Sequence, residues 1–429
     1  MKVAILTNFN SFNPGYSLTG IVQDQARMLL RHGHEPHLFC GEKYDHKYDA
    51  EFPAGVVIRP EVPFPKQIDY RKRNEVTQEH EAVAEAFGDK LVSLLADFDM
   101  GWTHDWVFTG WFLPYAIAVQ RASPRLPRVR WLHWIHSIPC TGYDWWDMKL
   151  YSRRHKLVSP TETERRRVAE QYRGEISDVR VIPHIKDPRV WYRFSQDSWD
   201  FIDDYPGCIQ ADVFQIYPAS ADRLTAKNVD KVIRIFGFMK KKLNRNVCFI
   251  CADQWATGRQ RREDEQTLID LARAVGLEES EFAFTSRWRP DEKGRGKYAT
   301  GIPSRMVAEL GLLQNLFIFP TIQESFGLVG PEAALGGAYV VTNRSLTNQL
   351  DVFDNIPNSY DFGSYHHTFN PESWDRYLEA VAYRILGRMH DNEAVWCKRH
   401  MIQKLNMDAV YENAYALVMA ESELWMEEK

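Results

Sequence analysis

Two carboxylates stand close together in a segment that otherwise carries small, apolar or glycine residues. They are Glu324 and Glu332 in TIQESFGLVGPEAALGG (321–337), with seven residues between them. The preceding run NLFIFP (315–320) predicts a buried strand. Pro331 suits the first turn of a helix. The segment therefore predicts a strand, a loop with the first carboxylate, and a helix start that holds the second.

The start of that helix favours an anion. Its free backbone N–H groups and positive dipole end attract negative charge, and Gly327 and Gly330 let a ligand approach the backbone closely. Carboxylates repel phosphate but accept strongly from sugar hydroxyls. A nucleotide diphosphate sugar, which carries both groups, fits both properties. The alternative is structural: Glu332 offsets the helix dipole and Glu324 is a solvated loop residue.

The rest of the chain alternates strands with helices, twice over. Buried apolar runs predict strands at 2–7, 35–40, 101–104, 129–135, 156–161, 179–184, 213–218, 246–253, 281–286, 315–320 and 338–343. Amphipathic runs predict helices at 21–34, 75–98, 228–243, 264–277, 304–313 and 330–337, and from about 372 to the end. This alternation predicts an α/β fold with parallel sheets covered by helices on both faces.

A segment without clear periodicity separates the two halves. We expect an N-terminal domain at 1–190, a junction at 191–212, a C-terminal domain at 213–405, and a C-terminal helix at 406–429 that packs back on the first domain. Ligands of open parallel sheets bind beyond the carboxyl ends of the strands. The loops at those ends, facing each other across a cleft between the domains, are therefore the expected site.

Composition narrows the class of protein. The chain has 429 residues, 44% of them hydrophobic, and a formal net charge of −5, which does not by itself indicate a nucleic-acid binder. No run approaches the roughly 20 apolar residues of a spanning helix, so we expect a soluble, cytoplasmic protein. Cys248 and Cys251 have metal-like spacing but no partner pair, and core thiols are expected. No Asp-x-Asp motif lies in the cleft loops, and no metal requirement is predicted.

The Glu-x7-Glu pattern, with SFGL after the first glutamate and EAALGG opening with the second, resembles the signature of retaining glycosyltransferases of family 4. That resemblance implies the GT-B architecture, two Rossmann-like domains facing across a cleft. Further similar stretches follow in order along the chain: GIVQDQARMLLRHGHEP (20–36), WTHDWVFTGW (102–111), LVSPTETERRRV (157–168), VRVIPHIKD (179–187) and ADRLTAKNVDKVI (221–233). Three positions depart from the usual pattern: Thr19 beside a single Gly20, His184 in place of Asn, and Asn228 in place of Gly.

The resemblance implies how a donor would be held. Arg223 and Lys227 would clamp the diphosphate, Glu324 would hold sugar hydroxyls, and Glu332 would hold the ribose. The implied donor contacts as a whole are Gly20, Arg223, Lys227, Ser286, Arg287, Pro303, Glu324, Ser325, Phe326, Gly327, Leu328 and Glu332. The implied co-substrate is a nucleotide diphosphate sugar, with a UDP-sugar favoured, and no further cofactor is expected.

The resemblance also implies acceptor-side residues. His136 stands where the family has a histidine near the reacting carbon, and His104, Asp105 and Trp106 resemble a stretch of its glycogen and starch synthase relatives. The implied catalytic residues are His136, Arg223, Lys227 and Glu324. The implied mechanism is front-face transfer with retention, in which the leaving diphosphate helps to take the acceptor proton.

The acceptor stays open. Residues 121–173 are rich in arginine and tryptophan, which suits a glycan, a lipid-linked acceptor, a small-molecule hydroxyl, or hydroxymethylated DNA of the kind phages glycosylate, in a host cytoplasm. The structural alternative is a solvated helix face and buried indoles. A phosphorylase or epimerase of the same architecture and a non-catalytic binding module for sugar nucleotides or nucleic acid remain as other functions. The sequence does not support a lysine for pyridoxal phosphate.

Overall fold

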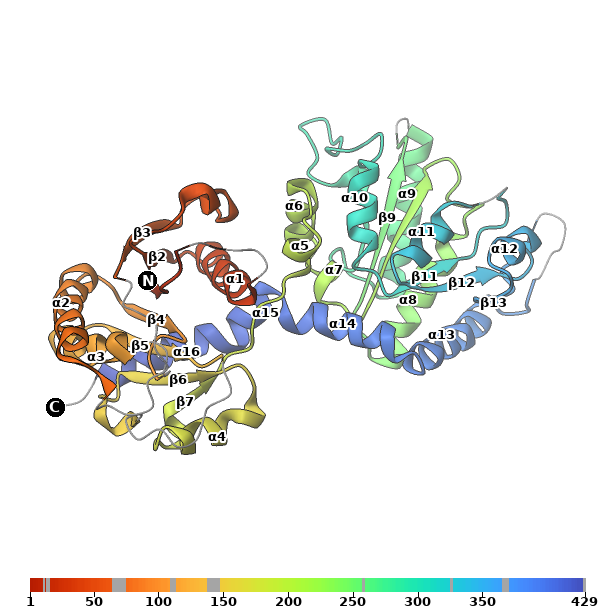
Figure 1. Ribbon diagram of the computed structural model, residues 1–429. Coiled ribbons are helices and arrows are strands. Elements are labelled where there is room, and N and C mark those ends of the chain that lie inside the picture. Colours follow the sequence, from red (N-terminus) through yellow and green to blue (C-terminus); the bar gives the residue numbers. More distant parts are fainter. Residues whose placement is uncertain are drawn as a thin grey trace. The chain divides into compact units, whose positions relative to one another are not determined.

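The computed structural model describes residues 1–10, 12, 16–63, 75–108, 113–136, 147–256, 259–324, 327–364 and 370–426. The chain divides into two compact units (Figure 1). Unit 1 comprises Met1–Lys186 and Leu405–Lys429, and unit 2 comprises Asp187–Lys404. Both contain parallel strands and helices, which confirms the α/β fold with two Rossmann-like parallel-sheet domains. The cleft between the domains stays a prediction.

Unit 1 contains one seven-stranded sheet in the order β3-β2-β1-β4-β5-β6-β7, and every pairing is parallel. The strand order reverses between β1 and β4, which makes the carboxyl ends of these strands the natural ligand edge. The strands are β1 Lys2–Leu6, β2 Glu35–Gly41, β3 Val57–Val62, β4 Met100–His104, β5 Arg130–Trp134, β6 His155–Ser159 and β7 Val179–Val181.

The helices of unit 1 bury an aromatic-rich core. They include α1 Ser17–Arg31, α2 Gln78–Leu95, α3 Leu113–Ala122, α4 Glu162–Gln171, α15 Met407–Val410 and α16 Ala416–Glu421. Thr77 caps α2 by accepting from the backbone N–H of His80. Trp102, Trp131 and Trp134 are at most 1% exposed, so they supply core packing and offer no binding surface.

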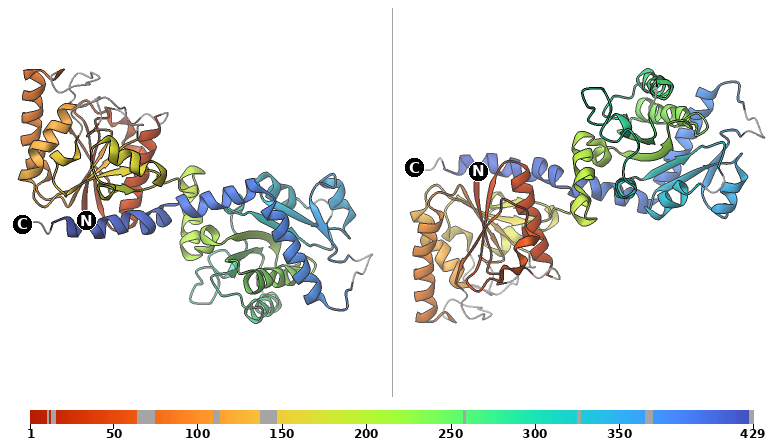
Figure 2. Two further views of the ribbon diagram at one scale, coloured as in Figure 1. Left: turned by 90° about the horizontal axis from the view of Figure 1, so that it is seen from below. Right: turned by 90° about the horizontal axis from the view of Figure 1, so that it is seen from above.

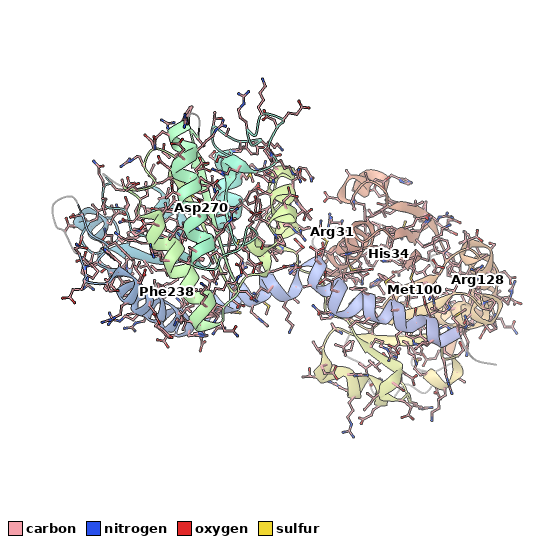
Figure 3. The ribbon with its side chains drawn as sticks, turned by 180° about the vertical axis from the view of Figure 1, so that it is seen from behind. Arg31, His34, Met100, Arg128, Phe238 and Asp270 are labelled. Atoms are coloured by element: carbon pink, nitrogen blue, oxygen red, sulfur yellow. The ribbon has the colours of Figure 1, made fainter. Side chains whose placement is uncertain are left out.

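The C-terminal segment belongs to unit 1. Arg31 pairs with Asp408 (Nε–Oδ1 2.6 Å), Tyr411 bonds His34, and Gln25 donates to the hydroxyl of Tyr415. Figure 3 labels Arg31 and His34 where they meet this segment. Both views of Figure 2 show the segment running beside the strands of unit 1. Contacts far apart in sequence thus hold the chain end in the first unit.

Unit 2 contains two three-stranded parallel sheets, β10-β9-β8 and β11-β12-β13. Side-chain amides join them where a backbone ladder would otherwise run. Gln215 on β8 donates to the carbonyl of Ile318 (3.0 Å) and accepts from its N–H (2.9 Å), and Asn315 accepts from the N–H of Phe214 (2.9 Å). The strands are β8 Val213–Ser220, β9 Val247–Gln254, β10 Phe282–Phe284, β11 Leu316–Phe319, β12 Tyr339–Asn343 and β13 Asn358–Tyr360.

The helices of unit 2 begin in the segment expected to be an irregular junction. Residues 191–212 lie wholly in unit 2 and contribute to three short helices. Pro188 occupies the first turn of the first of them, a position that suits proline. The helices of the unit include α5 Pro188–Trp191, α6 Gln196–Asp204, α7 Gly207–Gln210, α8 Val229–Leu243, α9 Arg259–Ala274, α10 Ser304–Gly311, α11 Val329–Leu335, α12 Thr347–Val352, α13 Trp374–His390 and α14 Glu393–Leu405. Within the described residues, no helix is long and apolar enough to cross a membrane.

Candidate functional site

Lys227 and Glu324 meet in an ion pair at the carboxyl edge of unit 2. Lys227 comes from the loop after β8 and Glu324 from the loop after β11. Their side chains are 10% and 12% exposed, so water screens the pair weakly. The cation predicted for the diphosphate and the carboxylate predicted for the sugar therefore neutralise each other in this structure.

Several hydrogen bonds lock the two loops together. The N–H of Ile322 donates to the carbonyl of Ala226 (3.0 Å), and Arg223 Nη2 donates to the carbonyl of Gln323 (3.2 Å). Asn343 on β12 donates to the carbonyl of Thr321 from the other side (2.9 Å). These bonds fix the loop that holds Lys227 against the loop that holds Glu324. Arg223 lies partly exposed beside the ion pair.

Asn228 explains one departure from the family pattern. It has φ 50°, a left-handed conformation that glycine adopts without strain and asparagine tolerates better than other side chains. Its amide donates to the carbonyl of Pro320 (2.7 Å). Asparagine thus adopts a conformation that is also open to glycine, and adds a bond that ties the Lys227 loop to the end of β11.

Gly327 allows the chain to lie against the strand below it. Its φ is 76°, and an added Cβ would lie 2.9 Å from the ring of Phe319 and from Gln349 Nε2. Leu328 follows on the surface, 65% exposed. The N–H of Gly330 already donates to the carbonyl of Gly327 (3.0 Å). Ser325 and Phe326, both predicted donor contacts, lie outside the described residues.

Glu332 lies in the first turn of α11, exposed, on the rim of a pocket between α10 and α11. This inter-helix pocket has a volume of about 430 Å³. Pro303 precedes α10, and Ser304 opens that helix on the rim. The other lining residues are mostly apolar: Ile216, Pro218, Val307, Ala308, Gly311, Leu312, Gln314, Phe317, Val329, Ala333, Leu335 and Gly336. A carboxylate and a hydroxyl therefore stand at the mouth of an apolar hollow.

Ser286 and Arg287 are engaged elsewhere. The N–H of Ser286 donates to Asp253 Oδ1 (2.9 Å), and Ser286 is 4% exposed. Arg287 pairs with Glu265 (Nε–Oε2 2.9 Å). Both residues hold a buried carboxyl pair, which weakens their assignment as donor contacts.

Asp253 and Glu265, which form this carboxyl pair, were not among the residues predicted from the sequence. Asp253 lies near the end of β9 and is fully buried, and Glu265 on α9 is 1% exposed. Burial raises the pKa of both carboxyls, and that of Glu265 reaches about 7, with the charge of Asp253 as a second cause. One signal was available: Glu265 stands three and four residues before Leu268 and Ile269, on the apolar face of its helix.

In unit 1, the structure brings His104, Asp105 and His136 together at the carboxyl ends of β4 and β5. His104 Nδ1 and His136 Nε2 are 2.9 Å apart, and Asp105 Oδ1 accepts from the N–H of His136 (3.0 Å). The ring of His184 stacks on that of His136 at 5.3 Å. Burial lowers the pKa of all three histidines, that of His136 to about 3. The three rings are therefore neutral near pH 7.

Two other histidines form a buried chain deeper in the sheet. Thr103 Oγ1 lies 2.8 Å from His133 Nδ1, His133 Nε2 lies 3.0 Å from His155 Nδ1, and Ser123 Oγ lies 2.6 Å from His155 Nε2. His133 is fully buried, and burial lowers its pKa to about 3. This chain of hydrogen bonds gives the buried polar side chains of β4 and β5 partners inside the core.

Two further predicted positions differ in their surroundings. Trp106 is fully buried against Phe87 and Tyr115, so it offers no acceptor contact. This corrects the prediction, because its ring supplies core packing. Gly20 lies inside α1 with no atom within 4 Å of an added Cβ. It therefore has room for a neighbour on that side.

The arginines of α4 pair within their own helix. Arg166 pairs with Glu170 (2.9 Å), and Arg167 pairs with Glu164 (3.3 Å). These are exposed pairs of a solvated helix face. The basic stretch therefore presents less free charge than its sequence suggests.

No family model and no curated protein matches the chain. Three similar solved structures are a glycosyltransferase from Rickettsia africae (11% identity, TM-score 0.39, 98% of each chain), HepE from Anabaena in complex with UDP (13%, 0.35, 98% of this chain and 100% of that one), and sucrose-phosphate synthase from Thermosynechococcus elongatus (14%, 0.36, 100% of both). At these identities and TM-scores the matches carry no argument about the reaction of this chain.

Proposed function

We propose that the chain is a glycosyltransferase that moves a sugar from a nucleotide diphosphate sugar to an acceptor hydroxyl. One observation carries the proposal: a buried lysine and a largely buried carboxylate are paired beside Arg223 in two interlocked loops at the carboxyl edge of unit 2. Taking both charges out of water costs free energy that their attraction does not always repay, so a role in binding a ligand would account for the pair. A donor that brings two negative phosphates and several hydroxyls can use both halves.

In the proposed donor complex, the diphosphate competes with Glu324 for Lys227. Phosphate oxygens take the ammonium group of Lys227 and the guanidinium group of Arg223, and Glu324 turns to the sugar hydroxyls. The leaving diphosphate gains negative charge as the glycosidic bond breaks. Two fixed cations stabilise that charge more than the ground state, which lowers the barrier.

The inter-helix pocket supports a place for the nucleoside. Glu332 on its rim is suited to accept from ribose hydroxyls, and the apolar hollow is suited to a flat base. This placement also explains why Ser286 and Arg287 are free to serve the carboxyl pair of Asp253 and Glu265. We favour UDP as the leaving group and propose retention of configuration without a metal ion, both on the resemblance of the Glu-x7-Glu segment.

The acceptor residues proposed in unit 1 are His104, Asp105 and His136. Asp105 accepts from the backbone N–H of His136, the neutral imidazole of His136 shares a hydrogen bond with His104, and its ring lies between two other rings. This imidazole suits the orientation of a hydroxyl by a neutral hydrogen bond. The α4 arginines already pair with glutamates of their own helix, which lowers the positive charge of that face, and we propose a glycan, lipid-linked or small-molecule hydroxyl.

The test is release of the nucleotide diphosphate from a panel of UDP-, GDP-, ADP- and CDP-sugars. Arg223→Ala and Lys227→Met should each lower kcat/KM for the donor about 10²–10³-fold, as expected for loss of a group that stabilises developing charge. Lys242→Ala, which removes an exposed cation from the far end of α8, should leave turnover unchanged.

Three results would contradict the assignment. Unchanged turnover in Glu324→Gln would remove the carboxylate from the site. Loss of activity in EDTA would contradict the metal-free mechanism. Donor binding with no turnover for any acceptor class would favour the non-catalytic binding module.

A further inference from the structure

Three arginines gather at the outer edge of unit 2, away from the candidate donor site. Arg344 follows β12, and Arg384 and Arg388 lie four residues apart on α13. They line a groove of about 740 Å³ beside β13, the outermost strand of its sheet (Figure 1). We call this the arginine groove. The donor site lies at β8 and β11, on the other side of β12.

The three guanidinium groups face a common space. Burial raises the pKa of the Tyr360 phenol, and Arg384, Arg388 and Arg344 all act in the opposite direction on it. Tyr360 also lines the groove. The arginines therefore approach one phenol from two elements, the end of β12 and the exposed face of α13.

The charge of the groove is not balanced by the chain. Within the described residues, Arg384 and Arg388 make no ion pair or side-chain hydrogen bond, and Arg344 donates only to Ser359 (Nη2 to carbonyl 3.1 Å). Asp391 is the single carboxylate of the lining, which leaves an excess of two positive charges. The charge of Asp391 raises the pKa of Tyr339, and the charge of Arg388 lowers it.

Repulsion between these arginines lowers the stability of the protein when no anion is bound. Like charges four residues apart destabilise a helix, whereas Arg259 and Arg273, two exposed helical arginines of the same unit, have glutamate or aspartate partners. Three guanidinium groups that converge beside a single carboxylate suit the oxygen atoms of a phosphate, which they bind with paired hydrogen bonds. Ser359, Asn355 and Asn358 line the same groove and can complete the coordination.

We propose that Arg344, Arg384 and Arg388 form a binding site for a phosphate-bearing ligand at the outer edge of β13. The ligand chemistry is an accessible phosphate group with room for an attached polar moiety, because the groove is open and mostly polar. The site is separate from the donor clamp and does not depend on the proposed transfer reaction.

The experiment measures binding of inorganic pyrophosphate by calorimetry to the full chain carrying Arg223→Ala, which removes one of the two cations of the proposed donor clamp. Pyrophosphate should bind this protein, and Arg384→Gln with Arg388→Gln should weaken the affinity at least tenfold. Arg376→Gln, an exposed arginine on the same helix outside the groove, is the matched control and should change it less than twofold. The melting temperature of each variant checks that the fold is intact.

A second probe separates the two sources of phosphate. A single-stranded oligonucleotide of about 12 nucleotides should bind more tightly than pyrophosphate if the groove follows a polymer backbone, with a salt dependence that falls in the double variant. If pyrophosphate alone responds to the double variant, the ligand is a small phosphorylated molecule. Equal affinity in the double variant, or equal losses in the double variant and Arg376→Gln, would overturn the proposal.

Discussion

The carboxyl edges of the two parallel-sheet units use opposite kinds of polar residue. Unit 1 buries neutral rings there, with His104, His136 and His184 stacked and linked by one hydrogen bond. Unit 2 places ion pairs there, in which Lys227 contacts Glu324 and Arg287 contacts Glu265. Similar frames of strands and helices can therefore present either a neutral hydrogen-bonding surface or a charged one.

The difference follows from how each unit avoids the cost of desolvation. An imidazole loses its proton and stays in the core as a neutral donor and acceptor. A lysine or carboxylate in the interior needs a partner or a proton. Every described histidine with a resolved shift has a lowered pKa and belongs to unit 1: His32, His34, His37, His104, His133, His136, His155 and His184.

The largest effect should come from removing one partner of the Lys227–Glu324 ion pair. Glu324→Gln or Lys227→Met leaves the other charge without its counter-ion in a largely buried position, and each should lower the free energy of unfolding by about 2–4 kcal/mol. The double variant Lys227→Met/Glu324→Leu should recover most of that loss. Hydrogen exchange resolved by peptide measures unit 2 within the full chain. A double variant as unstable as the sum of the single ones would show that the charges are not coupled.

Acid should weaken unit 1 first. The pKa of His133 and of His136 is about 3 in the folded chain, below the ordinary value near 6.5, so the unfolded chain binds more protons between these values. Their stabilising contribution is present above about pH 6.5 and is lost as the pH falls. Between pH 7 and 5 each should contribute about 2 kcal/mol of loss.

Hydrogen exchange of unit 1 at pH 5 and 7, corrected for intrinsic rates, measures this loss. His184→Asn should reduce the pH dependence because it removes one buried ring from the stack. His400→Asn, an exposed histidine of unit 2, should leave it unchanged. Equal pH dependence of the two units would remove the contrast between them.

The carboxyl pair should give unit 2 the opposite pH dependence. The folded pKa of Glu265 is about 7, above its ordinary value near 4.5. Its stabilising contribution is complete below about pH 4.5 and is lost as the pH rises through 7. Glu265→Gln, which mimics the protonated carboxyl, should stabilise unit 2 at pH 8 by about 1–3 kcal/mol. No gain at pH 8 would mean that Arg287 already balances both carboxylates.

The smallest effect should separate backbone conformation from hydrogen bonding at Asn228. Asn228→Gly keeps the left-handed conformation and loses the bond to Pro320, so it should cost about 1 kcal/mol. Asn228→Ala loses both and should cost roughly 1 kcal/mol more. Thermal unfolding measures the order. If alanine is tolerated as well as glycine, the conformation at this position carries little of the loop's stability.

The missed elements show which local signals fail. β3 contains Arg59 and Pro60, which interrupt the apolar alternation of a strand. α3 is buried almost throughout, so its sequence LPYAIAVQRA lacks a polar face. β13 has three residues and is too short for a pattern. The predicted strands and helices, by contrast, had regular periods or clear ends.

The candidate site divides in the same way. The position of Glu324 after a strand singled it out, the family resemblance singled out Arg223, Lys227 and His136, and the structure places all four at a carboxyl edge. The sequence could not show that Ser286 is covered or that Trp106 is in the core, because burial depends on which elements pack above a residue. Nor could it show the arginine groove, whose members come from β12 and α13.

The sequence by itself determined the alternation of strands and helices, the glycine and asparagine turns, and the charged residues at the strand ends, because these depend on local period and backbone conformation. The tertiary structure decided that Lys227 pairs with Glu324, 97 residues away. That contact exists because Gln215 and Asn315 join β8 to β11 side by side, so two distant loops leave the sheet at the same edge.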